Sequence, residues 1–361
     1  TSIKKFRTNQ NQEPLENLEP INYSEIKIKL DKEEFCRELT SFQKANVSKI
    51  AALNSGATFS VPGAGKTTEA LAFFFYKRRE GDKLLVICPK NAFPSWDEQA
   101  DECFTNSKGE ITRKIHFERL GSSDGDVGHV SIKRKLRKEP DFMLITYHQL
   151  ASKNKQGEFL TLELIAEYLK KHKVSIFIDE SHRMKAGDAG EHGSCILSLA
   201  HLSDMKLILT GTPMPQSPND LVGQIEFLYP SMRNLNENTA VDKIEPIFAR
   251  TCKADLGLPP PIRKLRYLKM KDSHRELYET IVSEDKLVSQ NYPPVIRHFF
   301  RKKLRAVVMR LIQISSNPKL LVSSETFDHK FDDLLADAIA VGDSSKIDYA
   351  VERALELANQ G

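Results

Sequence analysis

The stretch Ser60-Val61-Pro62-Gly63-Ala64-Gly65-Lys66-Thr67 follows a run typical of a buried strand and opens a helix-like segment. Glycines let the backbone turn tightly and direct N–H groups at an anion, and a helix N-terminus adds a positive field. The stretch therefore predicts a phosphate-binding loop, in which Lys66 reaches the outer phosphates of a nucleotide and the Thr67 hydroxyl binds Mg²⁺. The strict pattern G-x-x-x-x-G-K-[ST] has glycine where this chain has Ser60. A glycine-rich turn with an unrelated lysine is the alternative interpretation.

Two neighbouring carboxylates, in Ile178-Asp179-Glu180-Ser181-His182, end another strand-like run. Because the carboxyl ends of parallel strands meet at one edge of a sheet, this pair is predicted to face the phosphate loop. Asp179 would hold Mg²⁺ through its water shell, and Glu180 would orient and polarise the attacking water. A helix N-terminus with favourably placed acidic residues is the alternative.

A third strand-like run closes with Leu209-Thr210-Gly211-Thr212-Pro213. Taken alone, these small hydroxyl residues indicate only a Ser/Thr turn. Their position after the phosphate loop and the acidic pair makes them a third candidate part of the same site.

Short apolar runs alternate with amphipathic stretches from Asp31 onward. Nearly continuous apolar runs are typical of strands buried on both faces, so the fold class predicted is α/β with a doubly wound parallel sheet. The predicted strands are Thr58–Val61, Leu84–Cys88, Met143–Thr146, Ser175–Ile178 and Leu207–Leu209. The amphipathic stretches between them include Thr67–Arg79 and Leu160–His172.

The pattern changes after Pro230. The run Leu258-Pro259-Pro260-Pro261 is stiff and disfavours helix on both sides. A strand is predicted over Lys264–Met270, followed by helices from Asp272 to Leu321 and a last helix over Ser344–Asn359.

The composition excludes several classes of protein. With 361 residues, 40% of them apolar and 28% charged, the chain is neither disordered nor fibrous and has room for two or three domains. Its longest apolar stretch, around Ala70 to Tyr76, is far shorter than the ~20 residues of a membrane span. Five cysteines without a C-x-x-C pair indicate a reducing compartment, not a disulfide framework or a zinc site. A net charge of +4 is too small to identify a partner.

The order of the motifs G-x-G-K-T, D-E-x-H and T-G-T-P resembles the first motor domain of the superfamily-two helicases and translocases. Further segments resemble the Swi/Snf branch of that superfamily. They are Leu39–Gln43, Leu85–Lys90, Trp96–Gln99, Ile145–Tyr147, Asp179–Lys185, Leu209–Asn219, Leu258–Pro260, Leu277-Tyr278, Leu311–Leu320 and Ser345–Ile347. The resemblance runs in consistent order from about Asp31 to Gly361.

This resemblance implies a RecA-like P-loop lobe that binds ATP and Mg²⁺ and couples hydrolysis to movement along double-stranded DNA, tracking its backbone without reading bases. The nucleotide-binding residues it implies are Gln43, which would read adenine, with Gly63, Ala64, Gly65, Lys66, Thr67 and Thr68. It places Thr67 and Asp179 on the metal and makes Glu180, Lys66 and Asp179 catalytic. The residues that would couple the nucleotide state to DNA are His182, Thr210, Gly211 and Thr212. Further DNA contacts are predicted at Pro89, Lys90, Thr146, Arg301 and Lys302, where a solvated helix face is the alternative for the last two.

The predicted domains follow the same resemblance. They are an N-terminal extension (1–32), a RecA-like ATP-binding lobe (33–271), a helical protrusion and linker (272–343) and the start of a second RecA-like lobe (344–361). We expect the rest of that second lobe, with its arginine finger, in a longer chain, and therefore weak hydrolysis by these residues alone. A nuclease or a defence or repair protein is a further candidate partner, and no membrane contact is expected.

Two other functions stay open at this point. One is a nucleotide- and DNA-binding regulatory module without turnover, and the other is an RNA helicase of the same superfamily. Departures from the family pattern at Ser60-Val61-Pro62 and at Ser181 favour a divergent cytoplasmic protein, bacterial or phage-associated rather than nuclear, outside the chromatin remodellers.

Overall fold

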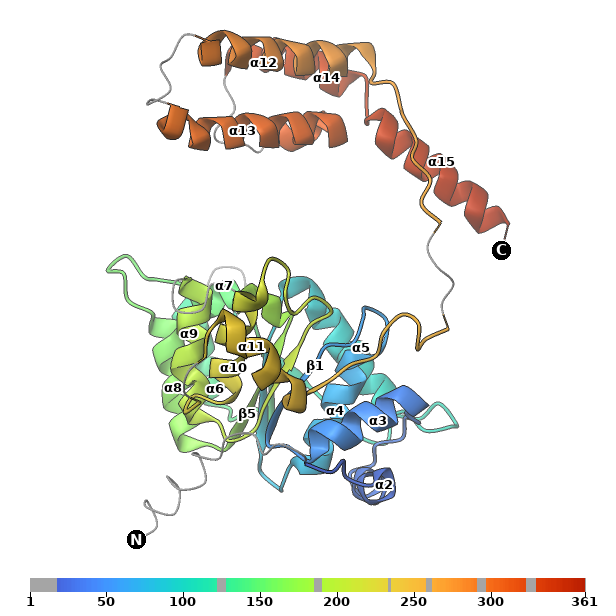
Figure 1. Cartoon of the computed structure of the whole chain (residues 1–361), viewed down its shortest axis with the longest axis vertical. Helices are drawn as coiled ribbons and strands as arrows, with labels where there is room; N and C mark the ends of the chain where they lie inside the picture. The colour runs from blue at the N-terminus through green and yellow to red at the C-terminus, as the bar shows by residue number, and fades with distance from the viewer. Residues whose placement is uncertain are drawn as a thin grey trace. The chain divides into compact units, whose positions relative to one another are not determined.

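The computed structural model describes residues 18–121, 128–184, 190–232, 235–257, 262–290, 297–322 and 329–360. The chain divides into two compact units, Thr1–Pro259 and Pro260–Gly361 (Figure 1), and each is described by itself. The domain boundaries drawn from the sequence at residues 32, 271 and 343 stay predictions. Within the described part, no helix combines the length and the apolar character needed to cross a membrane.

A parallel sheet forms the centre of the first unit. Its strands among the described residues are β1 (Ser55–Thr58), β2 (Lys83–Ile87), β3 (Phe117–Arg119), β4 (Phe142–Ile145), β5 (Val174–Asp179), β6 (Lys206–Leu209) and β7 (Phe248–Ala249). They pair in the order β3-β4-β2-β5-β6-β1-β7, and every pairing is parallel. The predicted α/β class with a parallel sheet is therefore confirmed.

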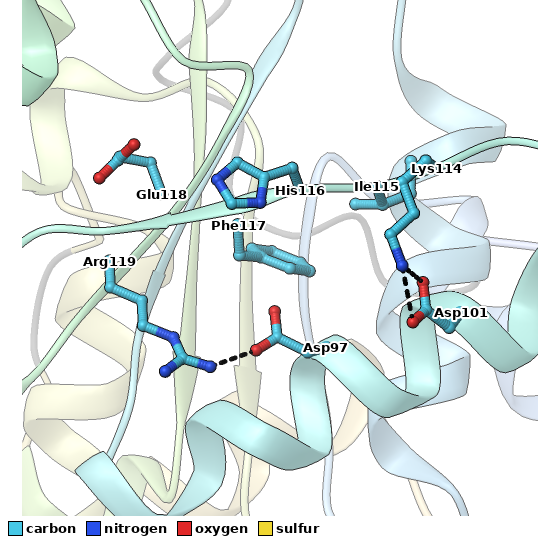
Figure 2. A pocket seen from close by; sticks show the side chains of 8 residues that line it. All are labelled: Asp97, Asp101, Lys114, Ile115, His116, Phe117, Glu118 and Arg119. Atoms are coloured by element: carbon cyan, nitrogen blue, oxygen red, sulfur yellow. Dashed lines mark hydrogen bonds and ion pairs between the residues drawn. The ribbon is translucent and has the colours of Figure 1, made fainter.

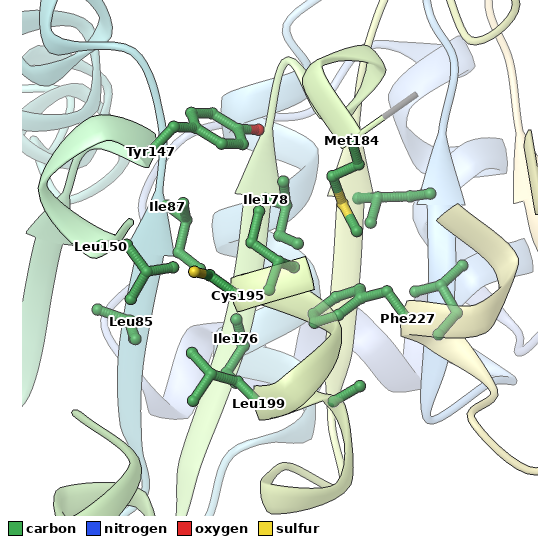
Figure 3. Packing of buried hydrophobic residues seen from close by; sticks show 14 of the residues in the cluster. Leu85, Ile87, Tyr147, Leu150, Ile176, Ile178, Met184, Cys195, Leu199 and Phe227 are labelled. Atoms are coloured by element: carbon green, nitrogen blue, oxygen red, sulfur yellow. The ribbon is translucent and has the colours of Figure 1, made fainter. Parts of the chain in front are cut away.

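Helices cover both faces of this sheet (Figure 1). They are α2 (Tyr23–Lys32), α3 (Ser41–Ala51), α4 (Lys66–Lys77), α5 (Phe93–Cys103), α6 (Gly128–Leu136), α7 (Tyr147–Leu150), α8 (Leu160–Lys171), α9 (Glu191–Leu199), α10 (Val222–Leu228) and α11 (Glu237–Ile244). Successive side chains of a strand point to opposite faces, so each strand supplies two cores. In β5, Ile176 and Ile178 pack with α9 and α10 (Figure 3), whereas Phe177 packs with α4 on the other face.

Helix α4 is the most deeply buried helix next to the site. Phe73, Phe74 and Phe75 are each fully buried, and Phe74 packs edge-on against both Phe142 and Phe177. Aromatic pairs of this geometry add to the burial of apolar area. The N-terminal end of α4, which begins at Lys66, is thereby held against the sheet.

Four elements of the first unit differ from the expectations drawn from the sequence. The first strand is Ser55–Thr58 instead of Thr58–Val61, although the bonds Phe59 N–Ala249 O (2.8 Å) and Val61 N–Thr251 O (3.1 Å) continue its contact with β7 and the residues after it. The strands β3 and β7 were not predicted, since two or three residues give too little alternation to detect. The N-terminal extension contributes α2, whose Ile26 and Leu30 are buried in the core.

The second unit is helical, as predicted. It contains α12 (Asp272–Gln290), α13 (Arg297–Ser316), the 3₁₀ turn η7 (Pro318–Leu321), α14 (Asp332–Ala340) and α15 (Ser345–Asn359). Leu277, Ile314 and Leu335 are among the residues of its own small core. The strand predicted over Lys264–Met270 is wrong. These residues are described without a strand partner, and without one their backbone groups have no ladder to join.

Lys206 places an ammonium group inside the first unit. Its side chain is 4% exposed, Nζ donates to the Ala200 carbonyl (2.9 Å) and lies 5.7 Å from the centre of the Phe227 ring. Burial lowers the pKa of Lys206 to about 7, against a smaller opposing effect of Asp204. The fold therefore disfavours the charged form.

We expect this lysine to make stability depend on pH. Below about pH 7 both folded and unfolded chains hold the proton, whereas between about pH 7 and 10 only the unfolded chain holds it. The free energy of unfolding should then rise by up to about 1.4 kcal/mol per pH unit. Lys206→Met should remove this rise. In urea unfolding at pH 6, 7.5 and 9, the free energy of unfolding of the variant should therefore exceed that of the wild type by less as the pH increases. Lys108→Met, at an exposed position, is the control, and a difference constant with pH would contradict the prediction.

Candidate active site

The sheet brings the three motifs to one edge. Strand β6 pairs with β1 on one side and with β5 on the other, and Leu209 lies opposite both Thr58 and Asp179. The phosphate loop, the acidic pair and Thr210 follow these aligned strand ends. The predicted meeting of the three motifs is therefore present in the fold.

The phosphate loop turns through two glycines with positive φ. Gly63 has φ 85° and Gly65 has φ 84°, and Gly65 precedes the first residue of α4. A Cβ on Gly65 would lie 2.1 Å from Gln43 Nε2, so a side chain there would also clash. Nζ of Lys66 donates to the carbonyls of Ser60 (3.0 Å) and Val61 (3.4 Å). The loop thus presents a helix N-terminus beside a lysine, the chemistry that binds phosphate.

Gln43 lies directly against this loop. Its Oε1 accepts from Thr40 N (3.0 Å), which caps α3, and its Nε2 donates to the Ala64 carbonyl (3.2 Å). Contact with adenine stays a prediction. Thr68, also predicted to bind the cofactor, is fully buried and donates to Gln99 Oε1 (2.8 Å), so its side chain is engaged elsewhere in this structure.

Asp179 is a largely buried carboxylate held in one orientation. Its Oδ2 accepts from Trp96 Nε1 (3.1 Å), and its Oδ1 accepts from Glu180 N (2.9 Å). Burial raises the pKa of Asp179, against these hydrogen bonds and the nearby charge of Lys66. Tyr147 supports the same strand end, because its hydroxyl donates to the Asp179 carbonyl (2.6 Å).

The donors at this edge fit Mg²⁺ with a nucleotide. Mg²⁺ prefers oxygen ligands and usually takes one or two from protein, with the rest from phosphate and water. The Asp179 carboxylate and the Thr67 hydroxyl are donors of that kind. A buried carboxylate with a raised pKa is also stabilised in its charged form by a cation. Among the described residues, no cluster of three or more His, Cys, Asp or Glu side chains is arranged to hold a metal by itself.

Glu180 adopts a left-handed backbone conformation, with φ 55°. Its carboxylate Oε2 lies 3.2 Å from His182 Nδ1, which in turn lies 3.0 Å from Thr210 Oγ1 and 3.4 Å from Thr212 Oγ1. His182 thus connects the acidic pair to the third motif. The structure thus places three of the predicted coupling residues, His182, Thr210 and Thr212, in contact with one another. Their role in coupling stays a prediction.

Some residues of the site were not singled out as site residues from the sequence. Trp96 and Tyr147 orient Asp179, and Gln224 accepts from the Ser181 hydroxyl (2.7 Å) while donating to the Pro213 carbonyl (2.9 Å). The hydroxyl of Ser181, a departure from the family pattern, therefore has a partner. Trp96 and Tyr147 lie in segments that resemble the family, which was a signal for them, whereas nothing in the sequence pointed to Gln224.

The residues predicted to contact DNA fall into two groups. Pro89 and Lys90, which begins the turn η1 (Lys90–Ala92), follow β2, and Thr146 follows the neighbouring β4. Thr146 caps α7, accepting from Gln149 N (3.1 Å) and donating to Gln149 Oε1 (3.0 Å). The side chains of Arg301 and Lys302 lie outside the described residues, and all five contacts stay predictions.

A cavity of about 390 Å³ lies beside the edge strand β3, away from these motifs (Figure 2). Two ion pairs line it, Arg119–Asp97 (2.6 Å) and Lys114–Asp101 (2.9 Å). No predicted site residue lines it, and its charges already neutralise one another. The site chemistry therefore belongs to the edge at β1, β5 and β6.

Comparison with known proteins identifies similar sequences. The family described as SNF2-related domain matches residues 52–320. The ATP-dependent helicase fft1 of Schizosaccharomyces pombe is 22% identical over 289 residues, covering 71% of this chain and 28% of that protein. The ISWI chromatin-remodeling complex ATPase ISW2 of Saccharomyces cerevisiae is 25% identical over 297 residues, covering 75% of this chain and 24% of that protein. The chain thus spans about a quarter of the length of these two relatives.

One solved structure is among the matches. The SWI2/SNF2 ATPase core of Sulfolobus solfataricus in complex with dsDNA has a TM-score of 0.45 and 19% identity, covering 86% of this chain and 63% of that one.

The curated relatives correct one expectation. They come from eukaryotes, and several carry chromatin remodelling in their names, including a remodeling factor of S. pombe and a protein of Arabidopsis thaliana. The preference for a bacterial or phage-associated cytoplasmic protein over a nuclear one, outside the chromatin remodellers, is therefore wrong. The departures at Ser60-Val61-Pro62 and Ser181 do not exclude such relatives.

We expect the backbone at residue 180 to cost stability. A side chain in the left-handed region is disfavoured by about 1–2 kcal/mol, and glycine avoids this cost. Glu180→Gly should therefore unfold with a free energy about 1 kcal/mol higher than Glu180→Ala in urea titrations. The same pair of substitutions at the exposed, helical Glu163 should give the opposite order. An equal or lower stability of Glu180→Gly would contradict the strain.

Proposed function

The chain belongs to the SNF2-related family, and from this premise we propose that it is the ATP-binding lobe of a motor that couples ATP hydrolysis to movement on duplex DNA. The observation that carries the proposal is the convergence of Lys66, Asp179, Glu180 and Thr210 at the ends of three adjacent strands. The family's members are generally ATPases. Hydrolysis by this chain, its dependence on DNA and the action of the whole protein are the proposed parts.

The residues of the site divide the work of phosphoryl transfer. When bound, Mg·ATP would supply the γ-phosphoryl group. Lys66, which now donates to two loop carbonyls, would bind a phosphate, and Asp179, oriented by Trp96, would hold Mg²⁺. Glu180 orients and polarises the attacking water. Catalysis of this kind depends on positioning and electrostatics, which the buried, hydrogen-bonded carboxylate provides.

His182 is the proposed link from hydrolysis to movement. Its Nδ1 lies within hydrogen-bond reach of both the Glu180 carboxylate and the Thr210 hydroxyl. A change at Glu180 on hydrolysis therefore changes the partners available to Thr210 and Thr212. These threonines lie on the loop after β6, from which the state of the nucleotide would be passed to DNA-contacting segments.

ATP turnover of the full-length protein, measured with duplex DNA, with duplex RNA and with neither, tests the proposed reaction. We expect stimulation by duplex DNA, because one relative of this chain is an ATP-dependent DNA helicase and another is the ATPase of a chromatin-remodeling complex. Glu180→Gln should lower turnover by about 10²–10⁴-fold while leaving ATP binding in place, whereas Lys66→Ala should weaken ATP binding itself. Glu163→Gln, on the exposed face of α8, is the control.

Three results would argue against this function. Stimulation by RNA alone would favour an RNA helicase. Nucleotide and DNA binding without any turnover would favour a regulatory module. Turnover unchanged in Glu180→Gln would show that the catalytic carboxylate lies elsewhere.

Lys90 gives a separate test of the DNA contact. It is exposed after β2, on the same edge of the sheet as the site. If it neutralises a phosphate, Lys90→Ala should make the slope of log binding constant against log salt less negative by about 0.9, equally for different sequences. Fluorescence anisotropy of labelled duplex DNA between 50 and 200 mM salt (about the range in which such slopes are measured) provides the data. An unchanged slope, like that expected for Lys108→Ala, would remove Lys90 from the interface.

A further inference from the structure

A ring of buried polar side chains lies directly behind the phosphate loop. Its five members are Asn46 of α3, Thr58 of β1, Ser60 at the start of the loop, Glu69 of α4 and Thr251 after β7. Each is at most 6% exposed. Buried polar groups are costly unless they are hydrogen-bonded, so a group of five at one point needs a physical account.

The hydrogen bonds of this ring close on themselves. Asn46 Nδ2 donates to Glu69 Oε1 (2.8 Å) and to Thr251 Oγ1 (2.8 Å). Thr58 donates to Glu69 Oε2 (2.7 Å), so its hydroxyl oxygen is left to accept from Ser60 Oγ (3.3 Å). Ser60 Oγ in turn accepts from the backbone N–H of Thr251 (3.0 Å). The amide hydrogens of Asn46 and the hydroxyl hydrogens of Thr58 and Ser60 all have acceptors in this arrangement, and Glu69 supplies both of its carboxylate oxygens.

The ring accounts for serine at position 60, where the strict phosphate-loop pattern has glycine. A glycine would leave the buried N–H of Thr251 without this acceptor and would open the ring. The same Ser60 offers its carbonyl to Lys66 Nζ (3.0 Å), so the residue that closes the ring also holds the phosphate-binding lysine.

Thr251 connects this ring to the end of the sheet. Its carbonyl accepts from Val61 N (3.1 Å), and the Ala249 carbonyl accepts from Phe59 N (2.8 Å), so the start of the loop is paired with the segment from β7 onward. That segment continues along the chain toward the second unit. A shift of the loop would break several buried hydrogen bonds together.

We propose that Thr251 is a positioning residue that holds the phosphate loop in its ATP-accepting conformation and ties this conformation to the segment after β7. Its backbone N–H holds Ser60, and its hydroxyl, the group that Thr251→Val removes, holds Asn46. The proposal rests on the proposed ATP-binding function. It adds to that function a residue far from the phosphate motif in sequence, which acts on the nucleotide only through the loop.

Three variants of the full chain separate this role from general stability. Thr251→Val removes the hydroxyl at nearly constant volume, and Thr251→Ser keeps it. Thr161→Val removes another buried threonine hydroxyl, in α8, as the matched control. The measurements are the Kd for methylanthraniloyl-ATP with Mg²⁺, taken well below the melting temperature, and hydrogen exchange at the amides of Phe59 and Val61 without nucleotide.

We expect Thr251→Val to weaken nucleotide binding about tenfold and to accelerate exchange at both amides. Thr251→Ser should stay within about twofold of the wild type on the same grounds, and Thr161→Val should change neither quantity. A lower melting temperature in Thr251→Val with unchanged Kd and unchanged exchange would overturn the proposal, because the ring would then be structural only.

The proposed ATP-binding function and the proposed role of Thr251 can be refuted separately. If the wild type and Lys66→Ala bind the nucleotide equally or not at all, the proposed function fails. Exchange then still decides the loop-holding role: faster exchange confined to Thr251→Val supports it, and unchanged exchange overturns it.

Discussion

The parallel pairing of β6 with both β1 and β5 is the constraint on which the site depends. Parallel strands point their carboxyl ends to the same edge, so the residues that follow three adjacent strands must emerge side by side. The pairing is stable because the three strands are buried on both faces, and β5 and β6 are apolar along most of their length. In β5, Ile176 and Ile178 enter one core and Phe177 enters the other. Burial of the strands in the sheet thus brings together the polar residues that follow their carboxyl ends.

The acidic pair at this edge of the sheet is held in an energetically unfavourable state. Asp179 has a raised pKa because it is largely removed from water, and Glu180 holds a left-handed backbone. Both are held by contacts from other parts of the chain, chiefly the Trp96 indole and the Tyr147 hydroxyl. A carboxylate kept in a fixed orientation needs little reorganisation when a metal and phosphates arrive, which is how electrostatic preorganisation acts.

The sequence predicted the central part of the fold closely and its margins poorly. The strands β2, β4, β5 and β6 lie within one residue of the predicted ends, because long apolar runs leave little freedom. Residues 59–61 read as strand yet lie beyond β1, and their hydrogen bonds go to Ala249 in β7 and to Thr251 after it, partners that no local pattern indicates. The run at 264–270 has strand-like alternation but no partner strand among the described residues, which shows that alternation alone does not form a strand.

The motifs and their order were enough to identify the family and to predict the chemistry of the candidate site, since a glycine turn before a lysine and an acidic pair after a strand are local patterns. The partners that orient these groups came only from the tertiary structure. Trp96 reaches Asp179, Gln224 reaches Ser181, and Thr251 reaches Ser60 across long separations in the chain. Hydrogen bonds between such distant residues form only because the order of the strands and the packing of the helices place them together. No short stretch of sequence determines that order or that packing.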